Sequence, residues 1–216
     1  MVQVFRIPIS KEKLKALSTD ERVLLLLLGY VSNQLMMMQK LLMFSANHED
    51  SDEPAIQYPQ SIQTQMILRL MIGLLHEAWD VIVTRFNKNA FNVEYRKLLD
   101  EGGLTALAEL NRQFGSSNLL TKIRNAFAFH HPNSAEAESA FEAALINKDF
   151  ADEDWALFFS QSGLNSLFFV SDVVVLHGIM EVMGETDWGV GQTKMVTEVK
   201  SATHNIVEFA KSFTVT

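Results

Sequence analysis

The residues best suited to catalysis lie in one short stretch, 118–132, which reads NLLTKIRNAFAFHHP. Arg124 precedes two histidines, His130 and His131, by six and seven positions. An arginine binds phosphate through two parallel hydrogen bonds and does not lose its charge. A histidine titrates near neutrality and can accept or release a proton during a reaction. These residue types at this spacing predict phosphate chemistry.

Helical spacing places the arginine on a face that should be apolar. Four side chains fall at i, i+3, i+4 and i+7, the pattern of a buried helix face: Leu120, Ile123, Arg124 and Phe127. If the turns continue, both histidines fall near the same face. Burying an unpaired guanidinium costs free energy. We therefore expect this face to open on a cleft, an acidic partner or another subunit.

The charge around the stretch favours an anion. No Asp or Glu occurs from Leu110 through Ala135, although the chain carries 26 acidic and 18 basic residues and a formal charge of -8. Arg112 and Lys122 lie in this window, so they are candidate substrate-binding residues beside Arg124. Proteins that bind nucleic acid over their whole surface are usually basic. Any contact with nucleic acid should therefore be local.

The segment Arg124-Asn125-(Ala-Phe-Ala-Phe)-His130 resembles the R-N-x-x-x(-x)-H signature of HEPN domains. The resemblance implies an all-α fold, a homodimer with two motifs facing one cleft, and metal-independent endoribonuclease activity of a toxin–antitoxin or phage-defence type. It implies that Arg124 holds the scissile phosphate, His130 moves protons, and Asn125 orients the site or the partner motif. His131 is the substitute for His130. RNA and an antitoxin-like protein are the implied partners.

Two other interpretations stay open. In the first, the chain is a non-catalytic helical dimer. In the second, it is a ligand- or nucleotide-binding module that uses the same cleft. In a purely structural version, Arg124 pairs with an acid of the fold and a histidine caps carbonyls at the helix end.

Other motifs fail on their spacing. The glycines at 184 and 189 lack the Lys and Ser/Thr of a phosphate-binding loop. His76 and Asp80 stand at i and i+4 without a third metal ligand, so a polar surface pair is the better interpretation. Arg69 and His76 repeat the Arg–His spacing without the asparagine. The absence of cysteine excludes thiolate metal sites and a cysteine nucleophile. We expect no metal and no cofactor.

Composition predicts one all-α domain over residues 1–216. Apolar residues make up 48% of the chain, enough for a core, while 10 Gly and 4 Pro are too few for a many-stranded fold. The N-terminal residues show no apolar signal segment, and no uncharged run reaches the length of a membrane span. We expect a cytoplasmic protein without membrane association.

Periodicity predicts a long antiparallel helix hairpin, from about Ser18 to Ala46 and from about Ser61 to Phe86, around an acidic loop at Asn47–Pro59. Ser116 or Ser117 should cap the helix that carries the motif, and Pro132 should end it. A short strand or extended segment at Trp155–Ser160 and a loop at Gly184–Gly191 are expected. The further helices are expected at Val93–Asp100, Leu104–Gln113, Asn118–Phe129, Ser134–Asn147, Leu164–Met183 and Gln192–Phe213.

Overall fold

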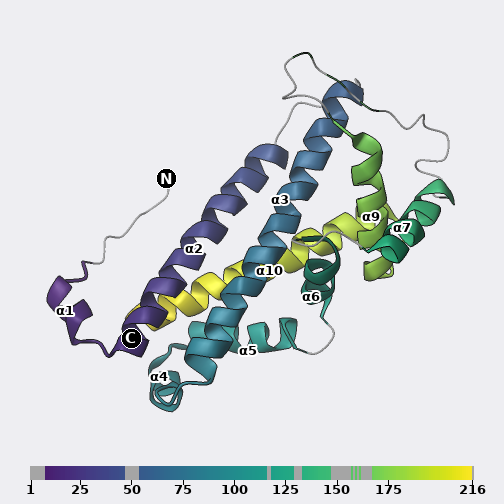
Figure 1. The fold of residues 1–216 in the computed structure, drawn as a ribbon. Coiled ribbons are helices and arrows are strands. Elements are labelled where there is room, and N and C mark those ends of the chain that lie inside the picture. Colours follow the sequence, from purple (N-terminus) through teal and green to yellow (C-terminus); the bar gives the residue numbers. More distant parts are fainter. Residues whose placement is uncertain are drawn as a thin grey trace.

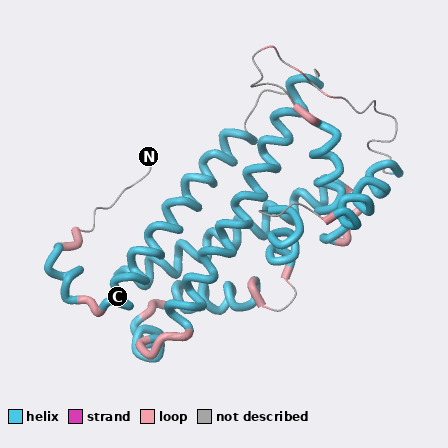
Figure 2. Tube along the Cα trace, viewed as in Figure 1, coloured by secondary structure: helices cyan, strands magenta, loops and turns pink. Residues whose placement is uncertain are grey.

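The chain forms a bundle of helices, as Figure 1 and Figure 2 show for the computed structural model. The structure describes residues 8–46, 54–115, 118–128, 133–146, 157, 159, 161 and 167–215. These residues contain no strand, which confirms the all-α prediction. Of the strand or extended segment expected at Trp155–Ser160, only residues 157 and 159 lie among them. The helices are α1 Lys11–Ala16, α2 Thr19–Ala46, α3 Pro54–Val81, η1 Ile82–Asn87, α4 Asn92–Leu98, α5 Glu101–Gln113, α6 Leu119–Ile123, η2 Arg124–Ala128, α7 Ser134–Ile146, α9 Phe169–Met183 and α10 Trp188–Val215.

The predicted hairpin of long helices is present as α2 and α3. Ser18 begins α2 with a capping box: its hydroxyl accepts from the Glu21 amide at 3.3 Å, and the Glu21 carboxylate accepts from the Ser18 amide at 2.7 Å. The loop predicted up to Pro59 is too long, because α3 already begins at Pro54. Proline suits a first helical position, where its backbone angle is correct and no N–H is needed.

α10 crosses the hairpin diagonally and joins it to the other helices (Figure 1). It packs on α2, α3 and α5, while α6 and η2 pack on α3 and α7 packs on α9. One core runs through most of these elements, and a second small cluster links α3, α7 and α9. Within the described residues, no helix combines the length and the apolar character that crossing a bilayer requires.

An aromatic cluster closes the bundle where η1, α4 and α10 meet. The ring of Phe86 lies 5.1 Å from Phe209 and 6.1 Å from Phe213, both edge-on, measured between centroids. Tyr95 stacks on Phe213, and its hydroxyl donates to Glu21 at 2.7 Å. Burial, followed by the contact with Glu21, raises the pKa of Tyr95 to about 12. The cluster thus ties the start of α2 to α4 and α10.

The Gly102-Gly103 pair falls between the helices expected at Val93–Asp100 and Leu104–Gln113, but in the structure it lies inside α5. Asp100 caps this helix by accepting from the Gly103 amide at 2.7 Å, and the Ser212 hydroxyl of α10 donates to the same carboxylate at 2.7 Å. A Cβ atom at position 103 would overlap the Ser212 side chain. The glycine therefore serves the close approach of α5 to α10, a contact that local sequence patterns do not reveal.

Two further boundaries near the C-terminus differ from the prediction. α9 begins at Phe169 rather than at Leu164, and residues 162–166 lie outside the described part of the chain. The loop expected at Gly184–Gly191 is shorter, because α10 starts at Trp188. Gly184 adopts φ 67° and ends α9, which is the left-handed conformation that glycine accepts at little cost.

Candidate functional site

The candidate site stands on α6 and η2. Asn118 caps α6 by accepting from the Thr121 amide at 2.7 Å, so the prediction of a serine cap at 116 or 117 is wrong. The buried face predicted from spacing is confirmed, since Leu120, Ile123 and Phe127 are each at most 7% exposed. These three side chains anchor the segment in the core and bring Arg124 to the edge of that face.

Arg124 is held by residues of its own chain. Its side chain is 27% exposed, and its Nη2 lies 3.6 Å from Oε1 of Glu77 on α3. Its Nη1 donates to Oδ1 of Asn125 at 3.1 Å, while the buried Nε has no hydrogen-bond partner. The sequence predicts that Arg124 faces a cleft, an acidic partner or another subunit. The structure shows an acidic partner from the same chain. Glu77 itself is 59% exposed, so the pair opens to solvent on one side.

The motif helix, residues 119–128, changes from α-helical to π-helical geometry at Arg124. Residues 124–128 form a π-helix rather than the α-helix that the spacing predicts. Helices of this kind occur mostly as short insertions and are frequent at functional sites. The α-helical turns that were expected to carry both histidines near the face of Phe127 therefore do not continue through residues 124–128. Both histidines lie outside the described residues.

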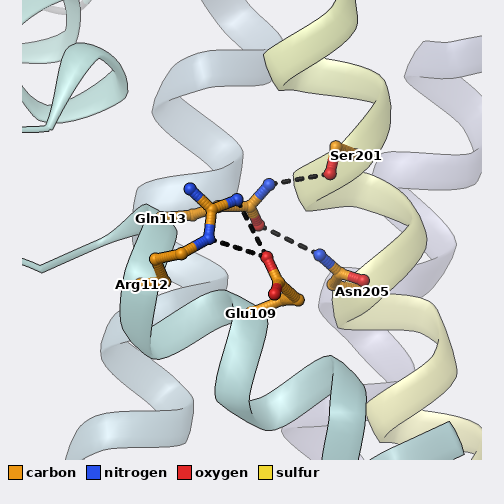
Figure 3. A network of polar contacts seen from close by, with 5 residues as sticks. All are labelled: Glu109, Arg112, Gln113, Ser201 and Asn205. Atoms are coloured by element: carbon orange, nitrogen blue, oxygen red, sulfur yellow. Dashed lines mark hydrogen bonds and ion pairs between the residues drawn. The ribbon is translucent and has the colours of Figure 1, made fainter.

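The two candidate substrate-binding cations have different surroundings. Arg112 at the end of α5 pairs with Glu109 at 2.8 Å and is 69% exposed (Figure 3). The neighbouring Gln113 instead points to α10, where it donates to the Ser201 hydroxyl at 2.8 Å and accepts from the Asn205 amide at 3.1 Å. Lys122 is exposed on α6.

The acid-free window of the sequence is not free of acids in space. Glu77 approaches Arg124, and Glu109 approaches Arg112, each from a position outside residues 110–135. The positive charge available to a bound anion is therefore smaller than the sequence window indicates. Reasoning along the sequence missed Glu77 as part of the site, because no spacing rule connects a residue of α3 to one at the end of α6.

A groove of about 470 Å³ lies on the other side of the motif helix, between η2, α7 and α9. Its polar groups are mainly acidic: Glu136 and Glu181 line it, and Ser139 donates to the Glu181 carboxylate at 3.3 Å. Two carboxylates repel a phosphate. The side of η2 that carries Arg124 and Asn125, rather than this groove, suits an anion.

Gly178 of α9 sets the position of η2. A Cβ at this position would lie 2.5 Å from Cζ of Phe127 and 3.3 Å from Cβ of Ala140. We expect Gly178→Ala to displace the Phe127 ring and to lower the free energy of unfolding by about 1–3 kcal/mol, the usual cost of overpacking. Urea unfolding measures this change.

Gly29→Ala is the matched control, because a Cβ built there on the helix α2 meets nothing within 4 Å beyond its chain neighbours and the backbone of its own helix. It should stabilise the chain by roughly 0.5–1 kcal/mol, the helix preference of alanine over glycine. Equal effects of the two substitutions would contradict this account of Gly178.

The remaining motif residues of α3 have structural partners. The His76 ring stands edge-on to Phe114 with 6.1 Å between centroids, and Arg69 pairs with Asp172 of α9 at 3.0 Å. Across the part of the chain that the structure describes, no three His, Asp or Glu side chains are grouped to hold a metal ion. Among the described residues, His76 and Asp80 therefore have no third side chain with which to bind a metal ion.

Comparisons of the chain with protein-family models, with curated proteins and with solved structures found no match. The candidate site is therefore defined by its own geometry. It consists of a partly buried arginine, the asparagine bonded to it, and a half-exposed glutamate opposite.

Proposed function

We propose that this chain is a HEPN-like, metal-independent endoribonuclease, of a toxin or phage-defence type. One observation carries the proposal: the two consecutive motif residues bond to each other, Arg124 Nη1 to Asn125 Oδ1 at 3.1 Å, at the solvent edge of an otherwise buried helix face. An oriented guanidinium whose side chain is partly open to solvent is suited to a phosphate oxygen. The position of Asn125 agrees with the orienting role that the resemblance implies.

The proposed reaction is an internal displacement at phosphorus. The 2′-hydroxyl of RNA loses its proton to a base and attacks the adjacent phosphate, and the 5′-oxygen of the next nucleotide leaves with a proton. Arg124 stabilises the negative charge that builds up on the phosphorane oxygens. His130 transfers the protons in this scheme, in accordance with the resemblance. The products are a 2′,3′-cyclic phosphate and a 5′-hydroxyl end.

Product analysis tests this function. Purified protein is incubated with RNA in the presence of a chelator, and the ends of the fragments are determined by mass spectrometry. We expect cleavage to survive the chelator and to leave cyclic phosphates. Fragments with 5′-phosphate ends, or cleavage that stops with the chelator, would refute the proposal.

Glu77 competes with the substrate for Arg124 in this scheme. The pair is long and open to solvent, and such pairs contribute about 0–1 kcal/mol. A bound phosphate can therefore replace the carboxylate. Removing the charge with Glu77→Gln should strengthen RNA binding by about 2- to 5-fold, which corresponds to the free energy of such a pair.

Fluorescence anisotropy measures this effect with an RNA whose 2′-hydroxyls are methylated, so that it cannot be cleaved. The matched control is Asp80→Asn, which removes the same charge from an exposed residue of the same helix that has no contact with Arg124. An equal gain in both variants would indicate a general charge effect and would contradict a specific competition by Glu77.

One observation favours the second candidate, a non-catalytic module. The contact of Arg124 with Glu77 links η2 to α3, as a structural ion pair would. In that case Arg124→Ala lowers the thermal stability of the chain, and the unaltered protein does not cleave RNA. A bound inorganic phosphate at Arg124 without RNA turnover would favour a ligand-binding version of this candidate.

A further inference from the structure

One face of α2 is apolar although it is exposed. Five large side chains follow one another at intervals of three to seven residues along this 28-residue helix, and each is between 46% and 79% exposed: Leu26, Tyr30, Met37, Leu41 and Phe44. Exposed Asn33 fills the wider interval and completes the stripe, which we call the α2 face. The opposite side of the helix, with Leu24, Leu28 and Leu35, is fully buried. The helix is therefore apolar on two sides, and the protein core accounts for only one of them.

The apolar surface extends beyond this stripe. Met36, Met43 and Met66 are also between 43% and 59% exposed. A groove of about 530 Å³ lies between α2 and α3 at the end that includes Phe44. Together the eight large side chains present on the order of 800 Å² to solvent, taking about half of each as exposed. A soluble monomer rarely exposes so large a contiguous apolar patch, and about 800 Å² is what each partner contributes to a standard interface.

The charge of the α2 face selects the kind of partner. Lys40 is the single charged residue between positions 23 and 46, in a chain with a formal charge of -8. Two copies of this chain repel each other through their net negative charge, but the described residues of the α2 face include no carboxylate. A strongly basic partner finds no complementary charge on this face, and a strongly acidic partner finds only Lys40. The face thus fits a second copy of itself.

We propose that the α2 face is the interface of a homodimer, in which two α2 helices pack antiparallel about a two-fold axis. A two-fold axis at the level of Leu35 places Leu26 opposite Phe44 of the second copy and Asn33 opposite Met37. Tyr30 then meets the turn that carries Leu41. The same patch serves both copies, as two-fold symmetry requires.

This interface is separate from the proposed ribonuclease site, and it differs from the dimer that the HEPN resemblance implies, in which two motifs face one cleft. α3 packs against α2 and also against α6 and η2, so it lies between the α2 face and Arg124 (Figure 1). The dimer therefore leaves Arg124 and Glu77 uncovered. It does not depend on the proposed activity, and either proposal can fail without the other.

Sedimentation velocity tests the dimer with the full chain. We expect the unaltered chain to be a dimer and the double variant Met37→Glu, Leu41→Glu to be a monomer. Because both side chains are about half exposed, circular dichroism should show unchanged helix content. The control Val93→Glu places a carboxylate on an exposed apolar residue of α4, away from the α2 face, and should stay a dimer.

Single cysteines then test the antiparallel arrangement, because the chain has no cysteine of its own. Met37→Cys lies near the proposed axis, so a short bismaleimide should link the two copies. Leu26→Cys should not be linked, because its two copies are about 27 Å apart along paired helices. A monomeric unaltered chain, a dimer that survives the double variant, or equal linking at both positions would overturn the proposal. A monomer that binds lipid vesicles through this face would also overturn it.

Discussion

Replacing Arg124 by alanine is expected to abolish RNA cleavage. The guanidinium is the charged group that would meet the developing charge on the phosphorane, and loss of one such donor typically lowers the rate by about 100- to 1000-fold. Arg124→Lys keeps the charge but loses the planar pair of donors, so we expect only partial recovery of kcat. Initial rates on a labelled RNA of defined sequence measure both variants.

The same variants separate catalysis from scaffolding. The Arg124–Glu77 contact is long, and Glu77 is 59% exposed, so removing the arginine should cost at most about 1 kcal/mol of stability. Thermal unfolding of Arg124→Ala provides this control. Cleavage that continues at the unaltered rate would eliminate the ribonuclease proposal, and a large fall in the unfolding temperature would assign Arg124 to the scaffold.

Replacing Phe86 by alanine should have the largest effect on stability. The side chain is fully buried, and its ring contacts Phe91, Phe209 and Phe213. Phe-to-Ala changes at such positions cost about 3–5 kcal/mol, because the apolar area is lost and a cavity remains. Urea unfolding followed by circular dichroism should show a correspondingly lower midpoint.

Val93→Ala is the control for the aromatic cluster. This side chain lies on α4, next to the cluster, but it is 66% exposed. Exposed substitutions of this kind usually change stability by less than about 0.5 kcal/mol. A comparable loss in the two variants would contradict the view that Phe86 anchors η1 and α10.

Much of the helical framework was predictable because its signals are local. The hairpin of α2 and α3 follows from apolar residues at helical intervals, and the buried face of α6 and η2 follows from Leu120, Ile123 and Phe127. The boundaries were less predictable. α3 starts at Pro54, inside the loop expected at Asn47–Pro59, and Gly103 lies inside α5, where it serves the close contact with α10.

For the candidate site, the sequence alone placed Arg124 on the helix face of Leu120, Ile123 and Phe127, because residue type and helical period act over a few neighbours. Only the tertiary structure decided that Glu77 of α3 faces the arginine, that Glu109 neutralises Arg112, and that the motif helix is π-wound. It likewise decided which apolar face of α2 the core covers. Charge pairing and burial depend on which helices meet in space, and packing over the whole chain sets that choice.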